Sequence, residues 1–242
     1  MASRQQVGQC NVCDMTNTHA ITNTEPPDLS LYYEVHQAMR LANEQILAGV
    51  TDPTLADNDR RRAKAMSRWF IGYCGELRGH HHAEDHLIFP ALSARVPAYA
   101  AYAETLAADH DRLDEILDGL GAALARMAAG DGWSSAKAEA TAFAVELRDL
   151  LIVHLGFEDS DVIPLIERHF GKEEYKVIED QIVKEISPKQ ALWTVPWWMS
   201  VTEPESAAKT LAEAPLPLKV IYYATRRRYA RLTKTAFGPG GK

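Results

Sequence analysis

Apolar residues recur every three or four positions along four stretches of the chain, from Leu29 to Gly49, Asp59 to Phe89, Pro97 to Ala129 and Ser134 to Glu167. This spacing places the apolar side chains on one face of an α-helix, and no segment alternates convincingly with the period of two that a strand requires. Proline and glycine punctuate the short links between the stretches. Because long helices joined by short links pack as antiparallel neighbours, the pattern predicts an all-α, up-down-up-down four-helix bundle over residues 29–168.

Two segments flank the predicted bundle. Residues 1–28 are polar and irregular, which indicates a flexible N-terminal segment, and residues 169–242 form a predicted C-terminal helical extension that packs on the bundle. The run from Leu192 to Met199 in this extension is rich in aromatic side chains, and we interpret it as a flap that packs on the bundle and could cover one end of it. The alternative is that these aromatic side chains make weak contact with a membrane surface or with a protein partner.

The end of the extension is basic. After Glu213 the chain has seven Lys or Arg residues and no acid, including Arg226, Arg227 and Arg228. A basic amphipathic helix could contact anionic lipid or nucleic acid. We favour the simpler interpretation, a solvated helix face or one that pairs with the acidic bundle.

The composition narrows the classes of function. The formal net charge of -7 argues against a general nucleic-acid binder, which is usually basic. We see no apolar run long enough for a transmembrane helix and no basic-then-apolar leader, so neither a membrane span nor a signal peptide is expected. Three cysteines do not make a disulfide framework. These features predict a cytoplasmic protein in a reducing compartment.

The most informative feature is an internal repeat with an offset of 74 residues. Its two copies read GHHHAEDHLIFPAL from Gly79 and VHLGFEDSDVIPLI from Val153. The matching pairs are His36 with His110, His80 with His154, Glu84 with Glu158, Asp85 with Asp159, and Pro90 with Pro164. Identity is low elsewhere, so the chain repeats a site on a repeated helix pair. Each copy has one His on its first helix and a His-x-x-x-Glu on its second.

This spacing predicts a metal site inside the bundle. Residues four apart share one helix face, so His80 points with Glu84 and His154 points with Glu158. A bundle brings four such faces to one axis, where the first-helix histidines can meet them. Imidazole and carboxylate together suit iron, zinc or manganese, and this number of ligands suits two ions bridged by the carboxylates. The six predicted ligands are His36, His80, Glu84, His110, His154 and Glu158.

The segments LYYEVHQAM, HHHAEDHLIFP, ADHDRLDEIL and HLGFEDSDVIP resemble the hemerythrin-like, HHE cation-binding family, with its H…HxxxE…H…HxxxE signature. The resemblance covers roughly residues 29–168. It implies a four-helix bundle that holds two iron ions joined by an oxo or hydroxo bridge, with zinc or manganese as possible substitutes. Matched position by position, it implies the same six ligands.

The resemblance also implies a small-molecule ligand, either hydrogen peroxide, O2 or NO. The chain departs from the oxygen-carrying hemerythrins, which have a His-x-x-x-His on the third helix, because Asp114 stands four residues after His110. This departure argues against reversible oxygen storage. We therefore expect a protein that binds or turns over a small oxidant, with catalase-like peroxide breakdown ranked first. If it is an enzyme, it is an oxidoreductase of this kind or one that handles NO. The alternatives are a non-catalytic oxygen, iron or NO sensor that signals through the extension, and a structural zinc bundle.

Three further residues lie one turn before predicted ligands. Glu76 precedes His80, and its carboxylate could hold the free N–H of that ring. Tyr32 and Tyr33 precede His36, and a hydroxyl there could hydrogen-bond a bound oxygen species. The alternative is that Glu76 is a solvated charge and that the two tyrosines pack in the core.

The remaining histidines lack a counterpart in the repeat. His82 and His86 lie on the far side of the helix from the ligand face and are expected at the surface, whereas His81 lies nearer the site. His19 and His169 have no motif around them and are assigned no role.

The cysteines give a weaker signal. Cys10 and Cys13 form a single C-x-x-C, which could bind zinc or act as a dithiol, although a disordered N-terminal segment is the simpler interpretation. Cys74 lies in an apolar helical stretch and is expected in the core.

Overall fold

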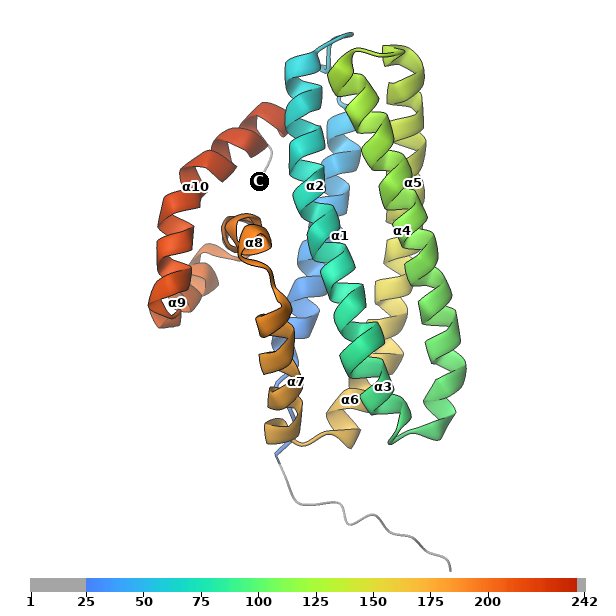
Figure 1. Ribbon diagram of the computed structural model, residues 1–242, viewed down its shortest axis with the longest axis vertical. Coiled ribbons are helices and arrows are strands. Elements are labelled where there is room, and N and C mark those ends of the chain that lie inside the picture. Colours follow the sequence, from blue (N-terminus) through green and yellow to red (C-terminus); the bar gives the residue numbers. More distant parts are fainter. Residues whose placement is uncertain (1–24, 239–242) are drawn as a thin grey trace, which may run out of the picture.

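The computed structural model describes residues 25–238, and every regular element in this range is helical. Four long helices run up, down, up and down, which confirms the predicted fold class (Figure 1). They are α1 (Ser30–Thr51), α2 (Arg60–Ala83), α4 (Ala100–Ala129) and α5 (Trp133–Phe157). In this part of the chain, no helix has the length and apolar character needed to cross a membrane. The C-x-x-C and His19 lie outside the described residues.

Local signals define the ends of these helices. The Asp59 carboxylate accepts a hydrogen bond of 3.0 Å from the backbone N–H of Arg62 and so caps the start of α2. At the end of α4, Gly130 adopts φ 78°, a left-handed conformation that favours glycine and lets the chain turn toward α5.

Two apolar clusters fill the interior. The larger one occupies the half of the bundle that contains Met39, Trp69 and Leu120, and the smaller one lies around Phe89 and Ile166 at the opposite end. Along each long helix, the predicted ligands fall at the boundary between the two clusters. The fold therefore places one polar layer between two apolar ones.

The periodicity had predicted that the second and fourth helices are continuous α-helices, but the structure shows an interruption in each. Each changes to a π-helical turn at its glutamate, η1 (Glu84–Ile88) and η3 (Glu158–Val162). The repeat supplies the reason, because Pro90 and Pro164 follow these turns. Proline has no N–H, and its ring collides with the carbonyl four residues earlier, so a wider turn relieves the collision.

Short elements close the lower end of the bundle. The chain continues from η1 into α3 (Phe89–Ser93), then through the 3-10 turn η2 (Pro97–Tyr99) into α4. After η3 it continues into α6 (Ile163–His169).

Four helices make up the C-terminal extension, α7 (Lys172–Glu185), α8 (Pro188–Val201), α9 (Pro204–Glu213) and α10 (Leu216–Phe237). Helices α8 and α10 pack against α1 and α2, and α7 contacts η1 (Figure 1). The aromatic run thus packs on the bundle, along its side and not over one end.

The extension shares the main core of the bundle. Trp197 of α8 is buried in the larger apolar cluster, and the Trp69 indole N–H donates a hydrogen bond of 3.0 Å to the hydroxyl of Tyr229 on α10. The Trp193 ring lies so close to Gly72 that a Cβ at this position would come within 2.3 Å of it. Glycine is therefore what lets α8 approach α2.

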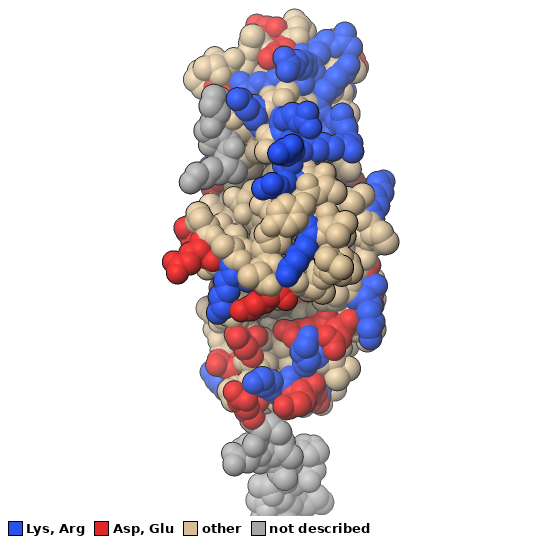
Figure 2. Space-filling model, turned by 90° about the vertical axis from the view of Figure 1, so that its left-hand side faces the viewer, with Lys and Arg blue, Asp and Glu red and all other residues tan. Residues whose placement is uncertain are grey.

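Positive charge gathers on one part of the face that the extension forms. Figure 2 shows Lys and Arg gathered over the upper part of this face, whereas Asp and Glu lie together with some Lys and Arg over its lower part. The basic part combines side chains of α2 and α10, including Arg61, Arg68, Arg228 and Arg231, around one shallow groove. The arginines of α10 are exposed, as expected of a solvated helix face, and Arg228 and Arg231 lie beside cations of α2.

Candidate metal centre

The structure brings the six predicted ligands together inside the bundle. They come from α1 (His36), α2 (His80), η1 (Glu84), α4 (His110), α5 (His154) and η3 (Glu158). Five of these residues are buried and His80 is half-buried. Both glutamates are 0% exposed, a placement that is rare for a carboxylate without a partner.

The four imidazoles form two pairs, and within each pair the Nε2 atoms face each other. The Nε2 atoms of His36 and His80 lie 3.1 Å apart, and those of His110 and His154 lie 3.2 Å apart. Each pair combines the two histidines of one repeat copy. Two ring nitrogens this close, both directed inward, match two ligands of one cation.

Each carboxylate reaches both imidazole pairs. Glu84 places Oε1 3.1 Å from His80 Nε2 and Oε2 3.5 Å from His110 Nε2. Glu158 does the same from the opposite side, with Oε1 3.3 Å from His154 Nε2 and Oε2 3.5 Å from His36 Nε2. Each glutamate therefore has one oxygen directed at each pair, the arrangement expected of carboxylates that bridge two ions.

A second layer of carboxylates holds the outer nitrogens of three rings. Asp159 Oδ1 lies 2.6 Å from His36 Nδ1, and Asp85 lies 3.0 Å from His110 Nδ1. Asp109 lies at 3.4 Å from the Nδ1 of His154. A carboxylate at Nδ1 keeps the proton on that nitrogen, so the lone pair of Nε2 is directed into the centre.

The electrostatics of the centre favour neutral imidazoles. Burial lowers the pKa of His154 to about 3 and also lowers the pKa of His36, against the raising effect of Asp159. A neutral ring is the form that binds a metal. Burial, and then the negative charge of Glu84, raise the pKa of Glu158 well above its usual value. Burial also acts to raise the pKa of Glu84, but His80 and other nearby histidines outweigh it and lower that pKa.

These residues fit a pair of cations. Glu84 Oε2 and both carboxylate oxygens of Glu158 are buried without a hydrogen-bond partner, which is costly for a carboxylate unless an ion neutralises it. Two groups of ligand atoms each lie within 4.8 Å of one another, and Glu84 belongs to both. One group is His36, His80, Glu84 and Glu158, and the other is His81, Glu84, His110 and His154.

His81 is an additional residue of the centre. It is buried, its ring stacks on that of His110 with centroids 4.0 Å apart, and neither of its ring nitrogens has a hydrogen-bond partner. Burial lowers its pKa well below the usual range, so the ring is neutral. The sequence placed His81 near the ligand face, but the absence of a repeated partner gave no reason to include it. His82 and His86 are exposed, as expected, and stack on each other.

The three residues predicted one turn before the ligands differ in their roles. The Tyr32 hydroxyl lies 2.5 Å from Glu84 Oε1 and donates to that carboxylate, so it orients a predicted ligand. Tyr33 is exposed, and its hydroxyl reaches only the backbone carbonyl of Asp159 at 3.4 Å. Glu76 accepts hydrogen bonds from Gln190 and Thr194 of α8, and none from His80 is found. It is neither a solvated charge nor the partner of an imidazole.

The family profile of the Hemerythrin HHE cation binding domain matches residues 28–166, more than half of the chain. The chain belongs to this family. Its cation-binding domain is thus the bundle, and the buried His and Glu cluster is the part that can hold a metal. No curated protein and no solved structure matches the chain significantly.

Two kinds of residue in this hemerythrin-family chain escaped the reasoning from sequence. Asp85 and Asp159 were visible as a repeated pair directly after the glutamates, and this was the signal that could have identified them. Asp109 directly precedes His110 but acts on His154, a contact that depends on the rotation of α4 against α5.

The remaining cysteine and histidine of the described residues lie away from the centre. Cys74 is half-buried against the core, and burial raises the pKa of its thiol to about 12. His169 is exposed.

Proposed function

We propose that this chain holds two iron ions and binds or turns over a small oxidant, with peroxide breakdown as the first candidate reaction. The observation that supports the proposal is that each of the two buried glutamates directs one oxygen at the first imidazole pair and the other oxygen at the second pair. Each ion would have two imidazoles and a share of both carboxylates. This donor set suits iron, and manganese or zinc could take the place of iron. The six proposed ligands are His36, His80, Glu84, His110, His154 and Glu158.

Iron bound among these side chains would supply Lewis acidity and reversible electron transfer to a small oxidant. The protein side chains contribute orientation and a dry environment. Tyr32 holds Glu84 through its hydroxyl proton, and Asp159 holds His36 in one tautomer. The smaller apolar cluster, which includes Phe89 and Leu106, packs against the centre on the side of η1 and η3 and excludes water from that side. In peroxide breakdown, two molecules of hydrogen peroxide would give one O2 and two waters, so no external electron donor is needed.

The second candidate function is a sensor in which the extension responds to the state of the centre. The observation that favours it is a cavity whose wall includes both His80 of the centre and several residues of α7 and α8. A change in the position of the His80 side chain would then alter the cavity that α7 and α8 line, and could shift these helices. Oxygen, iron or NO would be the signal, and a protein partner or membrane surface would respond to the moved helices.

The ligand assignment is tested by metal analysis of the full chain. Purified with ferrous iron, the protein should bind about two ions per chain, as di-iron bundles do, with an iron-dependent near-ultraviolet absorption band. Glu84→Ala and Glu158→Ala should each lose most of this iron, because each removes a carboxylate shared by both positions. His82→Ala and His86→Ala are the matched controls on the exposed face and should keep it. Equal losses in all four variants would refute the assigned ligand face.

The reaction is tested separately on the iron-loaded chain. Oxygen release and peroxide consumption in a ratio of one to two would support peroxide breakdown. If the iron-loaded protein leaves peroxide intact, while oxygen, NO or iron changes the protease sensitivity of α7 and α8, the sensor function replaces it.

A further inference from the structure

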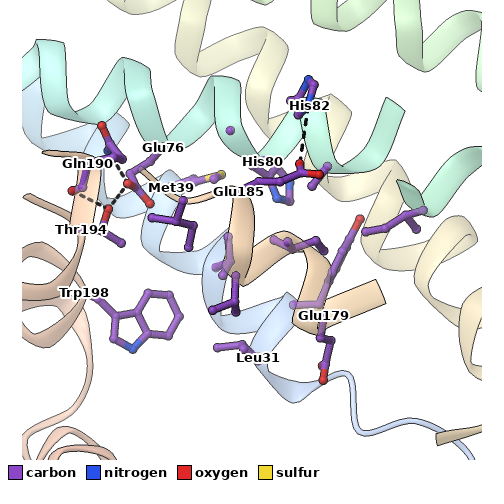
Figure 3. A pocket seen from close by; sticks show the side chains of 18 of the residues that line it. Leu31, Met39, Glu76, His80, His82, Glu179, Glu185, Gln190, Thr194 and Trp198 are labelled. Carbon is purple, nitrogen blue, oxygen red and sulfur yellow. Dashed lines mark hydrogen bonds and ion pairs between the residues drawn. The ribbon is translucent and has the colours of Figure 1, made fainter. Parts of the chain in front are cut away.

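A cavity of about 500 Å³ lies between the bundle and the extension. Its walls come from α1 and α2 on one side and from α7 and α8 on the other (Figure 3). It is lined mainly by apolar side chains, among them Leu31, Val35, Met39, Ile182, Val183 and Trp198. The extension, which lies outside the family match, therefore supplies one wall of a cavity whose other wall is the bundle.

The cavity reaches the candidate metal centre. His80 and Tyr32 both form part of its wall, and the same Tyr32 hydroxyl donates to Glu84. Figure 3 shows the polar group of Glu76, Gln190 and Thr194 at one end of the cavity and His80 further along it. A molecule in this space would lie beside a proposed ligand and have a hydrogen-bonding group at one end.

The size of the cavity does not match a small oxidant. Peroxide, O2 and NO each need only about one or two times the roughly 30 Å³ that a water molecule occupies in the liquid. Cavities of several hundred Å³ with apolar walls and a few polar groups are typical of sites for organic molecules. The space is therefore large enough for an organic molecule in addition to an oxidant at the centre.

The charges around the cavity select against anions. Its lining includes four acids, Asp28, Glu76, Glu179 and Glu185. Of the described residues that line it, none is Lys or Arg. An anion would enter a partly apolar space with carboxylates and no cation, and both burial and repulsion would oppose its binding.

We propose that this cavity is a binding site for an apolar organic molecule without negative charge, held beside the metal centre between the bundle and the extension. The site goes beyond the oxidant proposed above, because of the six proposed ligands only His80 lines it and because it needs no reaction at the centre. Glu76 is its main polar contact, since its carboxylate is presented by Gln190 and Thr194 and faces the cavity.

The test is equilibrium dialysis of the full chain, as purified, against two probes that share one ring frame. N-phenyl-1-naphthylamine is uncharged, and 1-anilinonaphthalene-8-sulfonate is the same frame with a sulfonate. We expect saturable binding of the uncharged probe with one site per chain and binding of the sulfonate weaker by about tenfold or more, a modest electrostatic preference.

Two substitutions on α7 locate the probe. Val183 lines the cavity and is 65% exposed, whereas Val177 lies on the same helix, is 67% exposed and is not part of the lining. Val183→Trp should weaken binding of the uncharged probe about tenfold by filling the cavity, and Val177→Trp should leave it unchanged. Both positions are at the surface, so circular dichroism should show both variants folded.

No saturable binding of the uncharged probe, equal binding of the sulfonate, or equal binding by the two variants would each overturn the proposal. Because dialysis measures neither iron nor turnover, failure here would leave the proposed metal centre standing. Loss of the metal centre would likewise leave the cavity result interpretable.

Discussion

At the scale of single residues, the two repeat copies hold each other's ligands. Asp85 follows Glu84 in the first copy but contacts His110 of the second, and Asp159 follows Glu158 in the second copy but contacts His36 of the first. The two glutamates cross over in the same way. Neither helix pair can therefore complete the centre alone, because each needs carboxylates from the other.

The two halves of the centre are nevertheless unequal. Arg40 pairs with Asp159 at 2.6 Å, whereas the residue at the repeat position of Arg40 is Asp114, which pairs with Arg78 on the surface. Tyr32 and His81 also have apolar counterparts in the repeat, Leu106 and Leu155. The two proposed metal positions thus differ in the charge and hydrogen bonds around them.

Asp159→Asn is expected to weaken iron binding by about 10- to 100-fold, because it removes the negative charge that orients His36 and raises the basicity of its ring. The measurement is iron retention against a competing chelator. Asp161→Asn is the control, since Asp161 is an exposed acid two residues further along. If both variants retain iron equally well, Asp159 has no role in orienting the ligand.

At the scale of helices, two local devices adapt regular elements to the centre. The π-helical turns begin at Glu84 and Glu158, so the extra residue of each turn lies directly after a proposed ligand and before Phe89 or Ile163 of the smaller core cluster. The wider turn changes the rotation of the helix about its axis. The carboxylate before the turn can therefore point into the bundle, and the apolar residues after it can also be buried. Such turns often occur at functional sites.

The second device is the glycine-lined contact between α2 and α8. Trp193 packs over Gly72 and is itself held by aromatic contacts with Trp69, Trp197 and Tyr229. The indole therefore has little freedom to move away from an added methyl group.

Gly72→Ala is expected to lower the free energy of unfolding by about 1–3 kcal/mol, because the new Cβ would overlap the indole and displace α8. Gly79→Ala is the matched control on the same helix, where no atom lies within 4 Å of an added Cβ. There the gain in helix propensity should raise stability by about 0.5–1 kcal/mol. Urea denaturation measures both effects, and equal shifts would show that α8 does not pack closely on Gly72.

At the scale of the whole molecule, bundle and extension share one apolar core. Trp197 and Tyr229 of the extension belong to the same apolar cluster as Trp69 and Met39 of the bundle. Removing the extension would expose this cluster to solvent, so the role of the extension is better examined by point substitutions than by deleting it. The family match ends at residue 166, so the core extends beyond the shared domain.

Trp197→Ala is expected to lower the free energy of unfolding by about 3–5 kcal/mol, the usual cost of removing a buried tryptophan, and to keep a single unfolding transition. Trp198→Ala should cost less, because Trp198 is half-buried whereas Trp197 is buried. Calorimetry and the change in helical circular dichroism should report the same midpoint. A separate early transition for the extension would mean that it folds independently of the bundle.

The sequence by itself determined the fold class and the six side chains that meet in the centre. Both depend on local spacing, since residues four apart share a helix face and the repeat identifies two such faces. Only the tertiary structure decided that His81 points inward, that Asp109 reaches His154, and that α7 and α8 enclose a cavity beside His80. These features depend on how each helix is rotated and which distant helix packs against it, and neither is encoded in the spacing along one helix.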